Sequence, residues 1–201
     1  MISIYELKPK FQQLLMPLVN TLHKHHVTPN QVTISACLLS ILTGVLFYLN
    51  FESAWMYAVI PVFMFVRMAM NAIDGVLAKK FNLTSRLGKF LNELTDVISD
   101  TALFIPFILV TQTFPASVII FIALSIISEM SGVLAEVTSG ERRYDGPMGK
   151  SDRAFLIGVI AVLLLFNVPL ESYLHIIFIA ASILIAFNIY KRVLGGMEES
   201  S

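Results

Sequence analysis

The sequence predicts an all-α integral membrane protein, in which six transmembrane helices follow an amphipathic helix at the membrane interface. Three observations predict this fold class. Hydrophobic residues make up 56% of the 201 residues and charged residues only 14%, whereas a soluble domain carries about 25% charge. Apolar runs of roughly 20 residues, the length that crosses a bilayer, recur along the chain. Lysine and arginine fall on one side of the hairpins that these runs form.

The first predicted element is an amphipathic helix over residues 3–26. Its apolar residues recur at spacings of three and four with lysines among the polar positions, as in a helix that lies along a membrane surface. A helix packed against the bundle gives the same pattern, and both interpretations stay open. The apolar residues are Leu7, Phe11, Leu14, Leu15, Leu18 and Leu22, and the lysines are Lys8, Lys10 and Lys24.

Six apolar segments follow, separated by short polar turns or charged loops. They run near 32–50, 54–78, 88–111, 115–137, 153–169 and 173–193. We therefore divide the chain into a juxtamembrane helix with its cytoplasmic lead-in, residues 1–31, and a six-helix membrane domain, residues 32–201. The N-terminal part lacks the continuous apolar core of a signal peptide, so we expect the N-terminus to be retained.

The basic residues predict the orientation. All of the 14 lysines and arginines except Arg67 lie on one side of the six-span arrangement. By the positive-inside rule this side is cytoplasmic, together with both termini, and we expect a multi-pass protein of the cell inner membrane. Arg67 lies within the second span, where a buried cation needs a counter-charge. Glu129 and Glu136 on the fourth span are the candidates for that ion pair.

Polar and acidic residues stand at helical spacing where the second span ends and the third begins. Each set occupies one helix face, and ionisable groups at membrane depth mark a functional site by default. Gly75 and Ala78 leave room for a ligand to touch the backbone. Hydrogen bonds between the helices would equally account for the polar residues. The first face holds Asn71, Asp74, Gly75 and Ala78, and the second holds Gly88, Asn92 and Asp96.

This segment resembles the CDP-alcohol phosphotransferase (CDP-alcohol phosphatidyltransferase) family, whose members share the pattern D-x2-D-G-x2-A-R-x8-G-x3-D-x3-D. The chain reads N-x2-D-G-x2-A-K-x8-G-x3-N-x3-D, with every spacing kept and five of the eight fixed positions identical. Lys79 keeps the charge of the arginine, whereas Asn71 and Asn92 replace carboxylates. The chain looks like a bacterial inner-membrane branch with asparagine at the same two positions.

The resemblance implies a metal-dependent transferase of phospholipid biosynthesis, of the EC 2.7.8 class. It moves a phosphatidyl group from a CDP-linked donor, CDP-diacylglycerol being favoured, to an alcohol acceptor and releases CMP. Two alternatives stay open: head-group transfer from a soluble CDP-alcohol to diacylglycerol, and a non-catalytic member that binds nucleotide or lipid. The resemblance also implies a homodimer, for which Ala123, Ser125 and Ser128 permit close helix contact. Membrane lipid is an expected partner and nucleic acid is not.

The metal site follows from the types of oxygen donor. Asp74 and Asp96 offer carboxylates, and Asn71 and Asn92 offer side-chain carbonyl oxygens, to Mg²⁺ or Mn²⁺. Two asparagines make the site less negative by two charges than the family pattern, so we expect one well-bound metal or a second weak one. By resemblance Asp96 is the general base.

Two further acidic residues can compensate for the missing charge. Glu93 and Asp100 lie at i−3 and i+4 from Asp96, on or near the same face of the third span. They are equally compatible with a structural role.

The nucleotide site is assigned by resemblance. A similar Pro-Asn-x2-Thr opens the first span of family members at the CDP site, although helix capping alone accounts for an asparagine there. The predicted nucleotide-binding residues are Asn30, Thr33, Asn71, Asp74, Gly75, Ala78, Lys79 and Gly88.

The loop from residue 140 to 153 reads GERRYDGPMGKSDR and faces the same side as the motif. Basic residues beside glycines suit an anionic group, so Lys150 and Arg153 are predicted to hold donor phosphates or an anionic, phosphorylated acceptor. Arg142 and Arg143 are interpreted as positive-inside charges. A loop that only touches lipid headgroups is the alternative.

Overall fold

The structure is a computed structural model that describes residues 4–197, with side chains from Phe11 onward, and it folds this stretch into eight helices without a strand. They are α1 (Ile4–Lys24), α2 (Pro29–Leu49), α3 (Ala54–Lys80), α4 (Arg86–Phe104), α5 (Phe107–Val110), α6 (Ala116–Ser139), α7 (Lys150–Leu165) and α8 (Leu174–Met197). The all-α prediction is confirmed for this stretch. Residue 3, the predicted start of the first helix, lies outside the described residues, as do the side chains of Leu7, Lys8 and Lys10.

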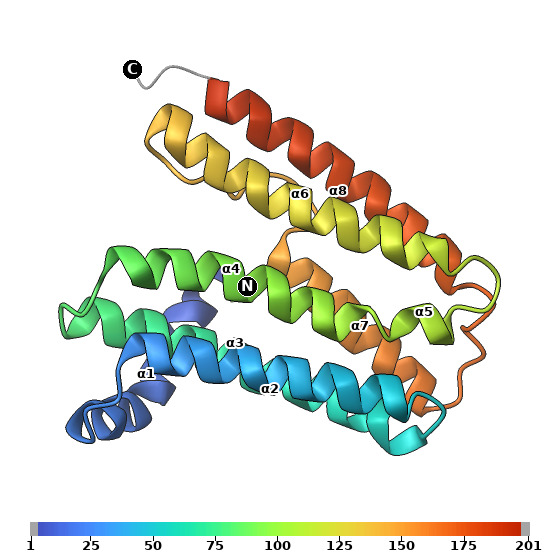
Figure 1. The fold of residues 1–201 in the computed structure, drawn as a ribbon, viewed down its shortest axis with the longest axis horizontal. Helices are drawn as coiled ribbons and strands as arrows, with labels where there is room; N and C mark the ends of the chain where they lie inside the picture. Colours follow the sequence, from blue (N-terminus) through green and yellow to red (C-terminus); the bar gives the residue numbers. More distant parts are fainter. Residues whose placement is uncertain (1–3, 198–201) are drawn as a thin grey trace.

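The long helices run side by side and alternate in direction (Figure 1). α6 pairs with α8 along its length, α2 packs between α3 and α4, and α7 packs against α3. α1 lies outside this bundle against α3. Six long helices thus follow α1 in the described stretch, one for each predicted span.

Four of these helices, α2, α3, α6 and α8, are long and apolar enough to cross a membrane. α4 carries the charged motif residues, and α7 has only 16 residues. A count of six spans therefore stays a prediction, and so does the division at residue 31.

Two helix boundaries differ from the predicted ones for local reasons. α2 begins at Pro29 because the Thr28 hydroxyl accepts a hydrogen bond from the Gln31 amide (3.3 Å) and the Gln31 side chain accepts one from the Thr28 amide (2.8 Å). Such a reciprocal cap fixes a helix start. The predicted third span is broken after α4, because Pro106 has no N–H to continue the helix and starts the short α5.

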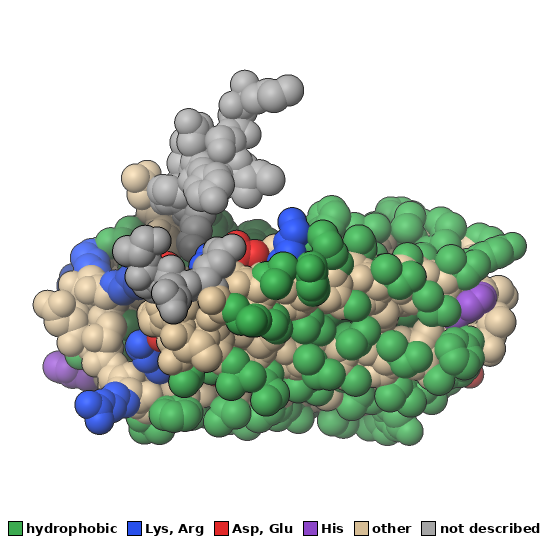
Figure 2. Space-filling view, turned by 90° about the horizontal axis from the view of Figure 1, so that it is seen from above, with side chains coloured by type: hydrophobic (Ala, Val, Ile, Leu, Met, Phe, Trp, Pro, Cys, Tyr) green, Lys and Arg blue, Asp and Glu red, His purple; other side chains and the backbone are tan. Residues whose placement is uncertain are grey.

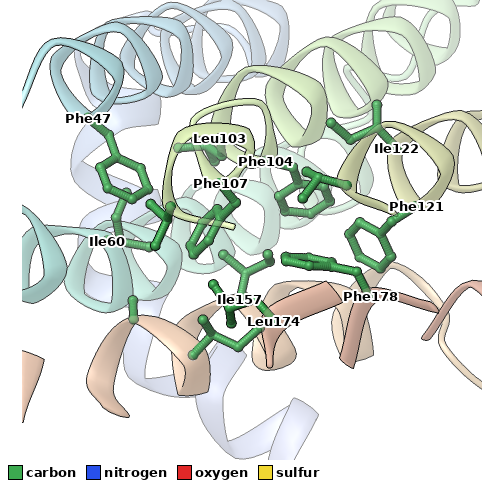
Figure 3. Packing of buried hydrophobic residues seen from close by; sticks show 14 of the residues in the cluster. Phe47, Ile60, Leu103, Phe104, Phe107, Phe121, Ile122, Ile157, Leu174 and Phe178 are labelled. Atoms are coloured by element: carbon green, nitrogen blue, oxygen red, sulfur yellow. The ribbon is translucent and has the colours of Figure 1, made fainter. Parts of the chain in front are cut away.

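An aromatic core holds one half of the bundle together. Phe47 and Phe107 meet edge to face with ring centroids 5.2 Å apart, and Phe121 meets Phe178 at the same distance. Figure 3 shows these rings interleaved with Ile60, Leu103, Phe104, Ile122, Ile157 and Leu174. Because these rings fix the helices at one end, side chains at the other end can be polar without loosening the fold.

The amphipathic helix α1 fits both interpretations of its pattern. Val19 is fully buried against Ile73 and Leu77 of α3. Leu14 and Leu18, by contrast, remain exposed. One apolar face therefore packs on the bundle, and another is left for lipid.

The basic connections share one end of the bundle. Lys89 at the start of α4 pairs with Glu136 near the end of α6 (3.3 Å), and Thr138 donates to the Gly196 carbonyl at the end of α8 (3.0 Å). Figure 2 shows hydrophobic side chains over most of one face, with most of the visible lysine and arginine side chains toward one end. That this end faces the cytoplasm stays a prediction.

Candidate active site

Asp74 anchors the site on α3. It is only 6% exposed, and the Thr33 hydroxyl of α2 donates to its Oδ2 at 2.7 Å. A buried carboxylate needs such donors, because an unpaired charge away from water is strongly unfavourable. Thr33, predicted to contact the nucleotide, therefore orients the carboxylate of Asp74.

Asp96 joins three helices. The Asn71 amide of α3 donates to its Oδ1 at 3.3 Å, and Lys150 at the start of α7 forms an ion pair with its Oδ2. Arg67 Nη2 lies 3.6 Å from Oδ1 and donates to the Asp96 carbonyl at 3.2 Å. The predicted general base is thus held by an amide and two cations, while its side chain stays 17% exposed.

The predicted partners of Arg67 were wrong. Its guanidinium pairs with Asp100 of α4 at 2.5 Å as well as with Asp96, and not with Glu129 or Glu136. The reason is helix packing: Asp100 follows Asp96 by one turn, just as Arg67 precedes Asn71 by one turn, so the two helices present matching pairs. Asp100, a predicted compensating carboxylate, is buried in this ion pair.

The start of α4 brings further motif residues close to α2. A Cβ on Gly88 would lie 3.0 Å from Asn30 Oδ1, so the two predicted nucleotide residues are neighbours. Asn92 is half-buried one turn before Asp96. Glu93, the other predicted compensating carboxylate, forms an ion pair with Arg142 instead of turning toward Asp96.

The glycine face of α3 is open. A Cβ on Gly75 would meet no atom of the described residues within 4 Å. Ala78 is half-buried and Lys79 is exposed. This face therefore leaves the backbone beside Asp74 accessible to a ligand.

The donor chemistry fits a hard cation. Asp74 and Asp96 supply carboxylate oxygens, and Asn71 and Asn92 supply amide oxygens on the same two helices, which are ligands that Mg²⁺ and Mn²⁺ accept. Within residues 4–197 no group of three or more His, Cys, Asp or Glu side chains is arranged to hold a metal. The site thus has two carboxylates, Asp74 and Asp96, where the family pattern has four.

A groove of about 590 Å³ runs between α3 and α7 to the site. Its polar end is lined by Arg67, Asn71 and Lys150, and the remainder is mostly apolar. Phe65 and Phe155 on its walls are 58% and 74% exposed, so the groove opens at the apolar outer surface of the bundle. This groove could not be predicted from the sequence, because its walls come from two helices that are distant in the chain.

Beside this site lies a cluster of arginines around Glu129 of α6. Arg153 Nη2 lies 2.7 Å from Glu129 Oε1, Arg142 Nη2 lies 3.0 Å from Oε2, and Arg192 Nη1 lies 3.7 Å from Oε1. The Arg153 side chain is fully buried and also lies 3.6 Å from Asp100. Its role toward an acceptor stays a prediction. Arg142 is more than a positive-inside charge, and our sequence reasoning assigned no role to Arg192.

Comparison with known proteins gives three results. The sequence matches the CDP-alcohol phosphatidyltransferase family over residues 26–188, which includes every motif residue. The inner membrane protein YnbA of Escherichia coli is 40% identical over 190 residues, 94% of each chain. Archaetidylinositol phosphate synthase of Pyrococcus horikoshii is 31% identical over 98 residues, which are 49% of this chain and 50% of that protein.

A solved structure shares the fold. Phosphatidylinositol phosphate synthase (PgsA1) of Mycobacterium tuberculosis, in complex with manganese and citrate, superposes with a TM-score of 0.74 over 92% of both chains at 20% identity. The similar helix arrangement extends over most of the chain, beyond the motif.

Proposed function

The chain belongs to the CDP-alcohol phosphatidyltransferase family, and from this membership we propose that it transfers a phosphatidyl group from CDP-diacylglycerol to an alcohol acceptor and releases CMP. One observation carries the proposal. α3, α4 and α7 converge on Asp96 at the end of a groove that opens at the apolar outer surface of the bundle. This arrangement suits a reaction between a lipid-linked donor and a polar acceptor.

The groove between α3 and α7 supports a lipid-linked donor. Its apolar walls suit acyl chains, which gain about 0.8 kcal/mol for each CH₂ group removed from water. Arg67 and Lys150 at the polar end offer positive charge to phosphates. The pyrophosphate of the donor would then lie beside Asp96, with its acyl chains in the groove.

The other side of the motif supports the cytidine end of the donor. Asn30 and Gly88 are neighbours there, and the open face at Gly75 admits a ligand to the backbone. Thr33 reaches the same place through its hydrogen bond to Asp74. Ala78 and Lys79 continue the face, and we assign them to the same nucleotide site.

Asp74 and Asp96, with Asn71 and Asn92, would hold Mg²⁺ or Mn²⁺. The manganese complex of the similarly folded PgsA1 supports this choice of ion. When bound, the ion offsets the negative charge of the pyrophosphate. We expect manganese anomalous scattering at Asp74 and Asp96, with weak occupancy of any second position. Manganese found only elsewhere would refute the assignment.

In the proposed reaction Asp96 accepts the proton of the acceptor hydroxyl. The acceptor oxygen forms a bond to the β-phosphorus, the bond between this phosphorus and the bridging oxygen breaks, and CMP leaves with the electron pair. Asn71 and Lys150 orient the Asp96 carboxylate for this step. General base catalysis of this kind contributes about 10²–10⁴-fold to a rate.

We place the protein in the inner membrane, with the motif and both termini on the cytoplasmic side. The gathering of basic connections at the motif end supports this orientation, and the likeness to an inner membrane protein supports the compartment. Protease protection of tags in oriented membrane vesicles tests it.

A homodimer is a further part of the proposal. Leu87, Phe90, Leu94 and Ile98 form an exposed apolar stripe along α4. The predicted small-residue contact is not its basis, because Ser125 and Ser128 are buried inside the bundle. Native mass spectrometry in a mild detergent measures the state.

The deciding experiment is CMP release by the purified protein in nanodiscs. CDP-diacylglycerol with a panel of alcohols and Mn²⁺ should release CMP, and metal chelation should stop it. Release only from a soluble CDP-alcohol with diacylglycerol would favour head-group transfer. Absence of release from both donors, with CDP still bound, would favour a non-catalytic member, to which the asparagines at positions 71 and 92 give some support.

A further inference from the structure

We infer that Glu129 is a built-in anion that occupies the arginine cluster beside the candidate active site, and that the alcohol acceptor is therefore uncharged. The assignment of an acceptor rests on the proposed function. The loop composition alone favours the opposite, an anionic acceptor held by Lys150 and Arg153.

The geometry of the cluster is that of a bound anion. Arg142 and Arg153 approach the two carboxylate oxygens of Glu129 at 3.0 and 2.7 Å, and Arg192 lies 3.7 Å from one of them. Guanidinium groups bind carboxylate and phosphate through the same planar contacts. The place that a phosphate would take among these arginines is thus filled by a side chain of the protein itself.

Neighbouring residues position the arginine side chains beside Glu129. A Cβ on Gly132, one turn after Glu129 on α6, would lie 3.2 Å from Arg192 Nη1. Arg192 also donates to the Ser128 carbonyl at 2.5 Å, and Arg153 donates to the Met148 carbonyl at 3.2 Å. Backbone acceptors and a glycine therefore hold the guanidinium groups where Glu129 meets them.

The cations around the site are matched by carboxylates. Lys150 pairs with Asp96, Arg67 pairs with Asp100, and Arg142 pairs with Glu93 as well as with Glu129. Five cations, Arg67, Arg142, Lys150, Arg153 and Arg192, thus form ion pairs with four carboxylates, Glu93, Asp96, Asp100 and Glu129, while Asp74 accepts a hydrogen bond from Thr33.

An anionic acceptor finds each of the three arginines around Glu129 already paired with that carboxylate. Its phosphate would have to displace a buried carboxylate from its arginines, and a buried charge that loses its partner is strongly destabilising. An uncharged polyol needs only hydrogen bonds and displaces no carboxylate, while the negative charge of the donor phosphates would be offset by the bound metal ion. By occupying these arginines, Glu129 therefore restricts the acceptor to uncharged alcohols.

Binding of inorganic phosphate tests this inference without any turnover. We would titrate phosphate, in calorimetry without metal, into the parent protein, Glu129→Gln and Glu136→Gln. Glu129→Gln keeps the size and hydrogen-bonding capacity of the side chain but leaves the arginines with one uncompensated charge. It should bind phosphate at least about tenfold more tightly than the parent, an effect of about 1.4 kcal/mol.

Glu136→Gln is the matched control. It makes the same substitution on the same helix, but Glu136 meets the exposed Lys89, so phosphate affinity should equal that of the parent. A phosphate site at the motif would appear equally in all three proteins. No gain in Glu129→Gln over this control would overturn the inference.

A second test of the inference measures phosphate binding to the parent protein, and it does not depend on whether Glu129→Gln folds. Phosphate binding to the parent that weakens in Arg142→Gln would show an open arginine site and overturn the inference. In the CMP-release assay, glycerol and inositol should serve better than their monophosphates, and the reverse preference would also overturn it. No CMP release with any acceptor would count against the proposed function, while the phosphate titration would still decide on Glu129.

Discussion

Two groups of charged residues lie next to each other in this helix bundle, and they differ in how far their side chains are removed from solvent. In the cluster around Glu129, both carboxylate oxygens meet guanidinium groups and Arg153 is fully buried. At the motif, Asp96 keeps 17% of its side chain exposed and stands at the end of an open groove. Buried charge alone therefore does not identify the candidate active site; the open groove that ends beside Asp96 distinguishes it from the cluster around Glu129.

The largest expected effect comes from removing the accessible carboxylate. Asp96→Asn should lower kcat by about 10³-fold or more, because it removes a base and a metal ligand together. CDP binding should persist, as measured by calorimetry. Asp145→Asn, in an exposed loop position, is the control. Activity of Asp96→Asn within about tenfold of the parent would exclude Asp96 as the base.

Substitutions in the buried cluster around Glu129 should change the stability of the protein. Arg153→Met removes a fully buried cation that Asp100 and Glu129 share, while Arg67 still pairs with Asp100 and Arg142 still pairs with Glu129. Breaking a buried ion pair costs about 3–5 kcal/mol. A lower apparent Tm in detergent and chemical denaturation measure this loss. If Asp96→Asn proved equally destabilising, the contrast between the two groups would fail.

The groove offers a smaller and more specific effect. A Cβ on Gly158 of α7 would meet no described atom within 4 Å, and Gly158 lines the groove. Gly158→Leu should therefore fold and obstruct the acyl chains, raising the KM for CDP-diacylglycerol about tenfold. Ala123→Leu, on the exposed side of α6, should leave this KM unchanged. Equal effects of both substitutions would argue against a lipid in the groove.

The smallest effect is expected at the surface. Lys89 and Glu136 form an ion pair at 3.3 Å, but the lysine side chain is 80% exposed. Exposed pairs contribute about 0–1 kcal/mol, so Lys89→Gln should shift the apparent Tm very little. A loss as large as that of Arg153→Met would mean that burial does not separate the strong pairs from the weak ones.

The sequence predicted the helices and the family because both depend on local patterns. Apolar runs mark the spans, and the spacing from Asn71 to Asp96 marks the motif. The resemblance drawn from that motif is confirmed by the family match over residues 26–188. The gathering of basic connections at one end followed from the alternating direction of the helices.

Contacts between helices could not be predicted in the same way, because they depend on the rotation of each helix about its axis. Arg67 had acidic candidates on two different spans, and only the placement of α3 and α4 on either side of α2 brings it to Asp100. The pairing of Lys150 with Asp96 likewise needs α7 to lie against α3. In the sequence, Glu129 stood out as a glutamate inside an apolar span. The sequence did not indicate which arginines surround it.

Because the groove opens sideways between α3 and α7, the concentration of the proposed lipid donor has to be expressed relative to the other membrane lipids. A lipid that enters between α3 and α7 arrives by diffusion within its leaflet and never passes through water. The relevant quantity is then its mole fraction among the surrounding lipids, and diluting the membrane with inert lipid slows the encounter even when the amount of donor in the tube is unchanged. In the proposed reaction the polar acceptor, in contrast, comes from the aqueous phase and follows ordinary molar concentration. Each reaction thus joins a two-dimensional search with a three-dimensional one, and lipid composition alone can regulate the rate.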